Sequence, residues 1–352
     1  MCVKKILSFA ASIIKLFMVI IFTVSSKADE NNIKYYSDDK GILSLMYHRF
    51  NEEKYPSTNI QMNIFLDQIK IIKDLNFNFY NPNDLEKNYD IPKKEKGILI
   101  TIDDGFSSFY EFAWPHLRDN QIPFILFIST EAVGKNGYMS WNQIREIEKE
   151  DNVYIGNHSH SHDYLVNFKK KDFEADINKA SRIFTKELGY NPIFFSYPFG
   201  EYSEEIKKYI SKNFKFSFGQ HSGVIDINKD RFELPRFPIN EKYGDLKRFK
   251  FLINLEPLQY KNLMPINKYI TDKNNPPIFS VEFFKNQNNI NNITCFSNEG
   301  NKWEKSKIYI NENILNIKFR EKFIFRRGRI NCSLNDAGTW RWFGTQFSVQ
   351  LN

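Results

Sequence analysis

The chain has 352 residues, of which 41% are hydrophobic and 16% are aromatic, so global disorder is excluded. Its length suits one large domain followed by a small one. The net charge of +7 comes from 49 basic and 42 acidic residues, interleaved without a long basic run. This charge distribution argues against nucleic-acid binding through a patch that tracks phosphates.

The N-terminus has the pattern of a secretory signal. Lys4 and Lys5 precede an apolar stretch, Ile6–Val24, and small residues follow in Ser26-Lys27-Ala28. The pattern predicts a signal peptide over residues 1–28, cleaved after the alanine. An uncleaved membrane anchor is the alternative, because the apolar stretch is long for a signal. In both cases the working part is expected outside the cytoplasm, in the periplasm or secreted.

Between residues 41 and 218, segments with strand-like and helix-like patterns alternate. The best-patterned helix is Asp172–Leu188, with Gly189 as its stop. The alternation predicts an α/β fold, a parallel sheet closed or nearly closed into a distorted (β/α) barrel over residues 29–260. The expected strands are 41–50, 77–80, 98–101, 123–129, 153–155, 193–197 and 214–218, and the expected helices are 60–75, 107–119, 141–150, 172–188 and 204–211.

The pattern changes after residue 260. Residues 261–277 carry three prolines and no periodicity, which predicts a linker. Helical signals are then absent, so residues 278–352 are expected to form a small all-β, sandwich-like domain. The strand candidates are 278–284, 292–296, 307–309, 314–319, 323–325 and 343–349.

Two features of this C-terminal segment leave alternatives open. The aromatic run Trp340–Phe343 either lines a sugar-binding face or packs in the sheet core. Removal of the signal leaves Cys295 and Cys332, which either form one disulfide in the exported chain or stay free.

Three polar clusters follow three predicted strands. A buried strand ends in Asp103 and Asp104, a second is followed by His158–His162, and a third by Ser196–Gly200. Each has a simpler explanation when taken alone: a helix cap, a surface patch and an ordinary turn. However, α/β barrels keep their sites at the carboxyl ends of strands, where these clusters would meet.

Together the clusters predict a metal site. Two histidines four residues apart and one carboxylate form a facial set that leaves positions open for water and substrate. A divalent ion held there lowers the pKa of its bound water and polarises a carbonyl oxygen. Since adjacent acids on an extended chain point in opposite directions, one of Asp103 and Asp104 can bind the metal while the other acts as general base.

These residues resemble the polysaccharide deacetylases of the NodB-homology class, carbohydrate esterase family 4. Thr101–Gly105 is similar to the family's Thr-Phe-Asp-Asp-Gly motif, and His158–His162 to its paired-histidine motif. The resemblance covers about residues 42–238 and implies a NodB-type barrel. It implies the following roles: Asp103 as catalytic base, Asp104, His158 and His162 as metal ligands, His160 as a variable position, and the backbone N–H of Phe199 as oxyanion donor.

The chain departs from the family pattern at two places. The family's third motif has an arginine two residues before its proline, where this chain has Ser196, and we expect Arg236 to supply the missing cation. The family's last motif, Leu-x-His, is not found near the end of the barrel. A similar run precedes His48 at the first strand, as in the subgroup resembling poly-N-acetylglucosamine deacetylases, which makes His48 the expected general acid and His221 the alternative.

The resemblance therefore implies an exported metal-dependent hydrolase that removes N-acetyl groups from an N-acetylhexosamine-containing polysaccharide. Asp103 would act as base on metal-bound water. The expected cofactor is a divalent ion, Zn²⁺ first, with other transition metals as alternatives. The expected partner is the acetylated polysaccharide, with no nucleic acid, and with a membrane only through an uncleaved signal anchor. The rival interpretations are an esterase or small-amide deacylase on the same scaffold, and a catalytically decayed carbohydrate-binding or assembly protein.

Overall fold

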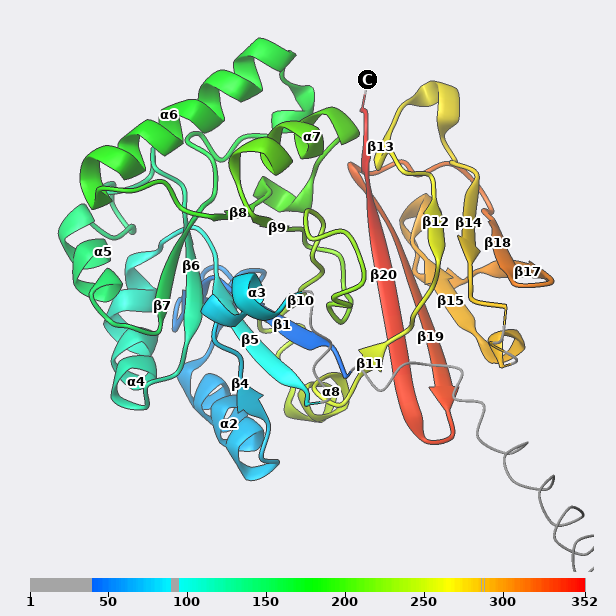
Figure 1. Cartoon of the computed structure of the whole chain (residues 1–352), viewed down its shortest axis with the longest axis horizontal. Helices are drawn as coiled ribbons and strands as arrows, with labels where there is room; N and C mark the ends of the chain where they lie inside the picture. The colour runs from blue at the N-terminus through cyan, green and yellow to red at the C-terminus, as the bar shows by residue number, and fades with distance from the viewer. Residues whose placement is uncertain (1–39, 90–94, 286, 288, 352) are drawn as a thin grey trace, which may run out of the picture. The chain divides into compact units, whose positions relative to one another are not determined.

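The computed structural model of the chain describes residues 40–89, 95–285, 287 and 289–351 (Figure 1). The predicted signal peptide, residues 1–28, lies outside the described residues. Within the described ranges, no helix combines the length and the apolar character that crossing a membrane requires.

The first part of the chain is built on an eight-stranded sheet in the order β10-β1-β5-β6-β7-β8-β9, with β4 paired to β5. Every pairing in it is parallel. Among the described residues no ladder pairs β9 with β10, and only an isolated parallel bridge from Phe218 to Leu234 spans that side, so the expected distorted (β/α) barrel is confirmed as an incomplete one. Its strands are β1 (Ile42–Tyr47), β4 (Asn78–Phe79), β5 (Gly97–Ile102), β6 (Phe124–Ile128), β7 (Val153–Asn157), β8 (Phe194–Ser196), β9 (Phe216–Phe218) and β10 (Phe237–Pro238).

Helices connect these strands, and Figure 1 shows α4, α5 and α6 packed outside β6 and β7. The expected helix 107–119 is divided into a π turn, η1, and a short helix, α4, which has Pro115 in its first turn. Because proline donates no backbone hydrogen bond, the ladder changes there. The helices are α2 (Met62–Asp74), α3 (Asn83–Asn88), η1 (Phe109–Ala113), α4 (Trp114–Asp119), α5 (Trp141–Glu148), α6 (Lys170–Leu188), α7 (Glu204–Asn213) and α8 (Leu246–Leu252).

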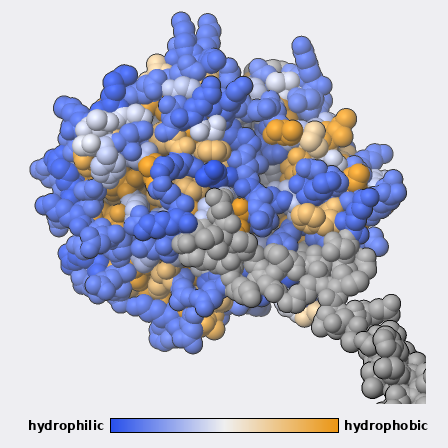
Figure 2. Space-filling model, in the orientation of Figure 1, coloured by the Kyte–Doolittle hydropathy of each residue, from blue (hydrophilic) through white to orange (hydrophobic). Residues whose placement is uncertain are grey.

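The central strands are buried on both faces, as in a covered parallel sheet. In β5, Ile98, Ile100 and Ile102 pack in the cluster that contains the helices. Leu99 lies in a second cluster with β9 and belongs to the opposite face. Because strand side chains alternate, Asp103 continues the second face beyond the end of the strand. The apolar side chains of these strands are buried in the core. The one face of the molecule drawn in Figure 2 is mostly hydrophilic.

The C-terminal part is all-β, as expected from the sequence. One sheet has the order β11-β20-β19-β15-β16 with β13 paired to β20, and the other has the order β12-β14-β18-β17. The strands are β11 (Glu256–Pro257), β12 (Asn262–Met264), β13 (Tyr269–Ile270), β14 (Phe279–Glu282), β15 (Thr294–Ser297), β16 (Glu304–Lys305), β17 (Lys307–Asn311), β18 (Ile314–Lys318), β19 (Arg327–Asp336) and β20 (Thr339–Val349).

The structure differs from the expected elements at two places in this part. Residues 261–277, expected to be a linker, contain β12 and β13, which pair with β14 and β20. Strands this short give no period-2 pattern. The candidate 323–325 is not a strand; the strand lies after it, as β19. There Gly328, Ile330, Cys332 and Leu334 are buried, and the residues between them are more exposed.

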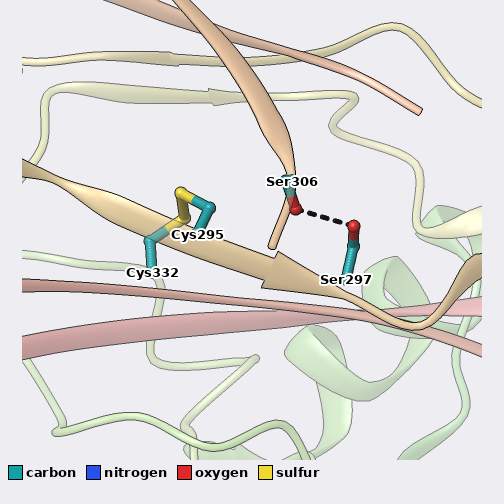
Figure 3. The surroundings of a disulfide bond; sticks show 4 residues. All are labelled: Cys295, Ser297, Ser306 and Cys332. Carbon is teal, nitrogen blue, oxygen red and sulfur yellow. Dashed lines mark hydrogen bonds between the residues drawn. A yellow bond between two sulfur atoms is a disulfide. The ribbon is translucent and has the colours of Figure 1, made fainter. Parts of the chain in front are cut away.

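Cys295 and Cys332 form a disulfide (Figure 3). They are directly paired residues of the antiparallel strands β15 and β19, and their Cα atoms are 4.1 Å apart. Beside them, the hydroxyls of Ser297 and Ser306 share a 2.7 Å hydrogen bond. The disulfide joins two cysteines that are 37 residues apart in the sequence. It therefore restricts the unfolded chain in addition to linking β15 to β19 in the folded sheet.

We expect the double substitution Cys295→Ala with Cys332→Ala to lower the free energy of unfolding. Loop-closure entropy for a segment of this length predicts a loss of about 4 kcal/mol. Denaturant unfolding of the oxidised protein and the variant measures the difference. The variant Ser306→Ala, which removes only the neighbouring hydroxyl, should lose far less. Equal stability of the double variant and the parent would contradict the prediction.

Candidate active site

The three polar clusters meet at the carboxyl ends of neighbouring strands. Asp103 follows β5, and its backbone N–H donates to the carbonyl of Tyr47 at 2.9 Å, which places the end of β1 beside it. His158 follows β7, and its ring Nδ1 contacts the carbonyl of Ser196, the last residue of β8, at 2.7 Å. The parallel register therefore gathers residues that are far apart in the sequence.

Asp103 and Arg236 form a fully buried ion pair at the centre of the site. Both side chains have no exposed surface. The guanidinium donates through Nη1 to Oδ1 at 2.6 Å and through Nη2 to Oδ2 at 2.8 Å, a bidentate arrangement. Burial by itself would raise the pKa of the Asp103 carboxyl, but the charge and the hydrogen bonds of Arg236 lower it. Asp103 is therefore held as a carboxylate.

The guanidinium of Arg236 also donates hydrogen bonds to three neutral oxygen atoms. Its Nε donates to the carbonyl of Gly219 at 2.9 Å, Nη1 also donates to Thr101 Oγ1 at 3.1 Å, and Nη2 to Ser196 Oγ at 2.8 Å. Ser196 stands where the family motif has an arginine. The small hydroxyl occupies that position, and the cation that contacts Asp103 is Arg236.

Asp104, His158 and His162 converge on a common point. One ligand atom from each lies within 4.8 Å of the other two, and Asp104 Oδ1 is 3.1 Å from His162 Nε2 and 3.4 Å from His158 Nε2. Since a carbonyl can only accept, the contact with Ser196 requires a proton on His158 Nδ1, which leaves a lone pair on Nε2. Among the described residues, His158 Nε2 and Asp104 Oδ1 are buried and make no hydrogen bond. Buried nitrogen and oxygen atoms that face one another at these distances without a hydrogen bond fit the ligand set of a divalent metal ion.

Left-handed backbone turns aim these side chains. Asp104 has φ +77°, Ser159 +66° and His162 +55°. Such conformations each cost about 1–3 kcal/mol outside glycine. The extended geometry assumed for the two acids is therefore wrong for Asp104: the turn after Asp103, rather than strand alternation, separates their directions.

Asp176 fixes the histidine loop from outside the motif. Its carboxylate, on α6, accepts the backbone N–H groups of His160 at 2.8 Å and Ser161 at 3.1 Å. Within the loop, Ser159 Oγ accepts the N–H of His162 at 3.0 Å. Asp176 belongs to none of the motifs, and its one signal in the sequence is a carboxylate sixteen residues after His160 on the predicted helix.

The Pro198-Phe199-Gly200 turn follows β8 and is held by the C-terminal sheet. Phe199 has φ +59°, and its ring lies 4.7 Å from that of His162. The side chain of Gln346, on β20, donates through Nε2 to the carbonyls of Phe199 and Gly200, both at 3.1 Å. With its carbonyl tied in this way, Phe199 is fixed in a strained turn beside the metal-ligand cluster.

The two candidate general acids both line the same cleft. His48 follows β1, and burial lowers its pKa, although the charges of Asp104 and Asp103 oppose this. His221 lies in the loop after β9, and burial lowers its pKa to about 4. Burial therefore favours the neutral form of both rings, and the pKa shifts do not separate the two candidates. His48 is the one whose pKa is affected by the charges of Asp103 and Asp104, which places it beside the proposed metal ligands.

The cleft over the site has a volume of about 1040 Å³ and has walls from both parts of the chain. Residues of the barrel side include His48, Asp104, His162 and Phe199. The C-terminal sheet contributes a second group, which the sequence analysis did not foresee apart from Trp342: Asn298, Asn301, Trp303, Phe325, Arg326, Arg327, Arg329, Asn331, Trp342 and Thr345. Trp342 of the aromatic run therefore faces the cleft, and its ring also packs against Phe237.

Comparison with known proteins gives consistent matches. Residues 90–216 match the family model described as polysaccharide deacetylase. A poly-beta-1,6-N-acetyl-D-glucosamine N-deacetylase of Staphylococcus aureus (strain MSSA476) is 23% identical over 249 residues, covering 62% of this chain and 85% of the relative. The Streptococcus pyogenes deacetylase PplD, solved with acetate, has a TM-score of 0.55 at 19% identity, over 61% of this chain and 99% of that one. IcaB from Ammonifex degensii has a TM-score of 0.53 at 23% identity, and the match covers 61% of this chain and 97% of IcaB. The solved structures share the fold.

We expect Arg236→Met to destabilise the protein by about 3–5 kcal/mol, because it leaves the Asp103 carboxylate buried without a counter-charge. Denaturant unfolding at neutral pH measures this loss. Adding Asp103→Asn to the variant should recover part of the loss, since it removes the uncompensated charge. Arg182→Met, on the exposed face of α6, is the control and should have little effect. An Arg236→Met variant as stable as the parent would show that the pair does not form.

Proposed function

We propose that this chain, which carries a polysaccharide deacetylase domain of the NodB-homology class, is an exported metal-dependent enzyme. Its substrate would be a polysaccharide that contains N-acetylhexosamine, and its reaction the hydrolysis of the acetamide to acetate and a free amine. The observation that carries the proposal is the juxtaposition of a buried, arginine-bound carboxylate with a cluster of two histidines and a second carboxylate, of which Asp104 and His162 line the cleft.

Asp104, His158 and His162 would hold the metal, which the unpartnered Asp104 Oδ1 and His158 Nε2 fit. Two nitrogen ligands and one oxygen suit Zn²⁺ or another divalent transition metal. When bound, such an ion supplies a water of lowered pKa and polarises the acetamide carbonyl.

The remaining steps belong to the protein's own side chains and backbone. Asp103, kept ionised and oriented by Arg236, accepts the proton of the attacking water. The N–H of Phe199 donates to the carbonyl oxygen as negative charge develops on it. His48 gives a proton to the nitrogen as the C–N bond breaks, so the amine leaves neutral.

One rival interpretation, a catalytically decayed protein, loses ground on the same contacts. A decayed site was suggested by the missing motif arginine, but Arg236 makes a bidentate contact with the same carboxylate. An O-acetyl esterase on this scaffold would depend less on the general acid, because an alcohol leaves more readily than an amine. Export rests on the pattern of residues 1–28 and remains a proposal with the rest.

The proposal is tested by acetate release from a panel of N-acetylated glycans, with acetylated xylan as the O-acetyl comparison. We expect release from at least one N-acetylated glycan, loss of that release with a chelator, and its return with Zn²⁺. Asp104→Ala should hold no metal by elemental analysis, whereas Asp67→Ala, exposed on α2, should hold it normally. Acetate release that survives chelation, or that occurs from xylan alone, would contradict the proposal.

Asp103→Asn should retain the metal but lose acetate release by about a hundredfold or more, the range of a general base. The matched control is Asp67→Asn, which changes the same group on an exposed helix face. Metal content and steady-state kinetics are measured on both variants. A variant that turns over at the parent rate would remove Asp103 from the mechanism.

A further inference from the structure

The cleft over the site is strongly asymmetric in charge. Its basic lining residues come from the helix α8 region and from β19 and the segment before it; we call this set the cationic wall: Lys242, Arg248, Arg326, Arg327 and Arg329. Among the described residues that line the cleft, the one acidic side chain is Asp104, a proposed metal ligand. A ligand in this cleft therefore meets an excess of positive charge.

Strand alternation places two of these arginines and an asparagine on the cleft side of β19. Arg327, Arg329 and Asn331 are separated by single residues and all line the cleft. The residues between them, Gly328 and Ile330, are buried in the sheet core. The guanidinium groups are thus presented in a row by a rigid strand, which the disulfide ties to β15 one residue further along.

Neighbouring groups hold these cations in place. Arg329 Nε donates to Gln346 Oε1 at 2.9 Å, the same amide that holds the Phe199 turn. The guanidinium of Arg326 lies 3.8 Å from the centre of the Tyr164 ring. Burial lowers the pKa of Arg329 to about 10, so it remains charged at neutral pH.

One buried carboxylate, that of Glu201, neutralises part of the positive charge of the cationic wall without lining the cleft. Glu201 is 1% exposed, and its oxygens lie 3.5 Å from Arg326 and 3.7 Å from Arg327. It does not line the cleft. Burial raises its pKa to about 7, so it is only partly ionised near neutral pH. The cationic wall thus keeps most of its charge available to a ligand.

We propose that the cleft selects an anionic polysaccharide, one that carries carboxylate or phosphate groups beside its N-acetylhexosamine units. This inference rests on the proposed deacetylation and narrows its substrate class. Planar guanidinium groups bind carboxylate and phosphate oxygens in pairs, which gives geometric selection as well as attraction. A concave site lined by one sign of charge also concentrates the field that draws in a ligand of the opposite sign.

The test compares three hexasaccharide-length probes on the metal-loaded full chain. The acidic probes are a heparosan oligomer, in which glucuronate alternates with N-acetylglucosamine, and an oligomer of N-acetylglucosamine 1-phosphate, which separate carboxylate from phosphate. The neutral probe is a β-1,6-linked N-acetylglucosamine oligomer. Acetate release per acetamide group and the Kd from calorimetry are measured at low and at physiological ionic strength.

We expect at least one acidic probe to bind about tenfold more tightly than the neutral one at low ionic strength, with a smaller difference when salt screens the charges. Lys242→Gln and Arg327→Gln should each lower kcat/KM and affinity for that acidic probe by about two- to fivefold, the range of partly exposed ion pairs, and change the neutral probe less. The controls Lys318→Gln on β18 and Arg182→Gln on α6 remove the same charges from exposed positions outside the cleft and should leave the acidic-to-neutral ratio unchanged.

The outcomes separate this inference from the proposed function. Equal or tighter binding of the neutral probe, or equal loss on both kinds of probe in the variants, would overturn the anionic preference even if acetate is released. Preferential binding of an acidic probe without acetate release from any glycan would support the preference and overturn the deacetylase proposal.

Discussion

The buried ion pair between Asp103 and Arg236 is the constraint around which the site is arranged. A carboxylate with no exposed surface is stable only with a counter-charge and full hydrogen bonding. Arg236 meets that need because the chain supplies a carbonyl and two hydroxyls for the rest of its guanidinium. A large side chain in place of Ser196 would occupy the space of that contact. The small side chain at Ser196, where the family motif has an arginine, therefore leaves room for Arg236 and accepts one of its hydrogen bonds.

The backbone turn after Asp103 gives the two adjacent acids different partners. Asp103 continues the inner face of β5 after Leu99 and Thr101, so it reaches Arg236. Asp104 turns away through a left-handed backbone conformation and meets His158 and His162. One carboxylate is committed to an arginine, and the other is left to a metal. Asp103 and Asp104 have the same side chain but different partners because β5 ends just before them and the backbone turns at Asp104.

The barrel and the motif residues could be predicted from the sequence because both depend on local patterns. Runs such as Phe124–Ile128 predict buried strands, and strand ends in a parallel sheet predict where polar groups meet. The contact between Arg236 and Asp103 spans 133 residues, and only the resemblance pointed to it. Gln346 gave no signal, since the Phe199 and Gly200 carbonyls that it holds lie 147 and 146 residues before it. Strand β19 was missed although its buried residues alternate, because Gly328 near its start and Asn335 and Asp336 at its end are weak strand formers.

Gln346 joins the two parts of the chain at the site. Its oxygen accepts from Arg329 of the cationic wall, and its nitrogen donates to both carbonyls of the Phe199 turn. An amide is suited to this position because it accepts on one side and donates twice on the other. A shift of β19 relative to the barrel would therefore move the turn that is proposed to hold the oxyanion. The C-terminal sheet is therefore part of the site's framework: its long paired strands β19 and β20 border the cleft, and the disulfide joins β19 to β15.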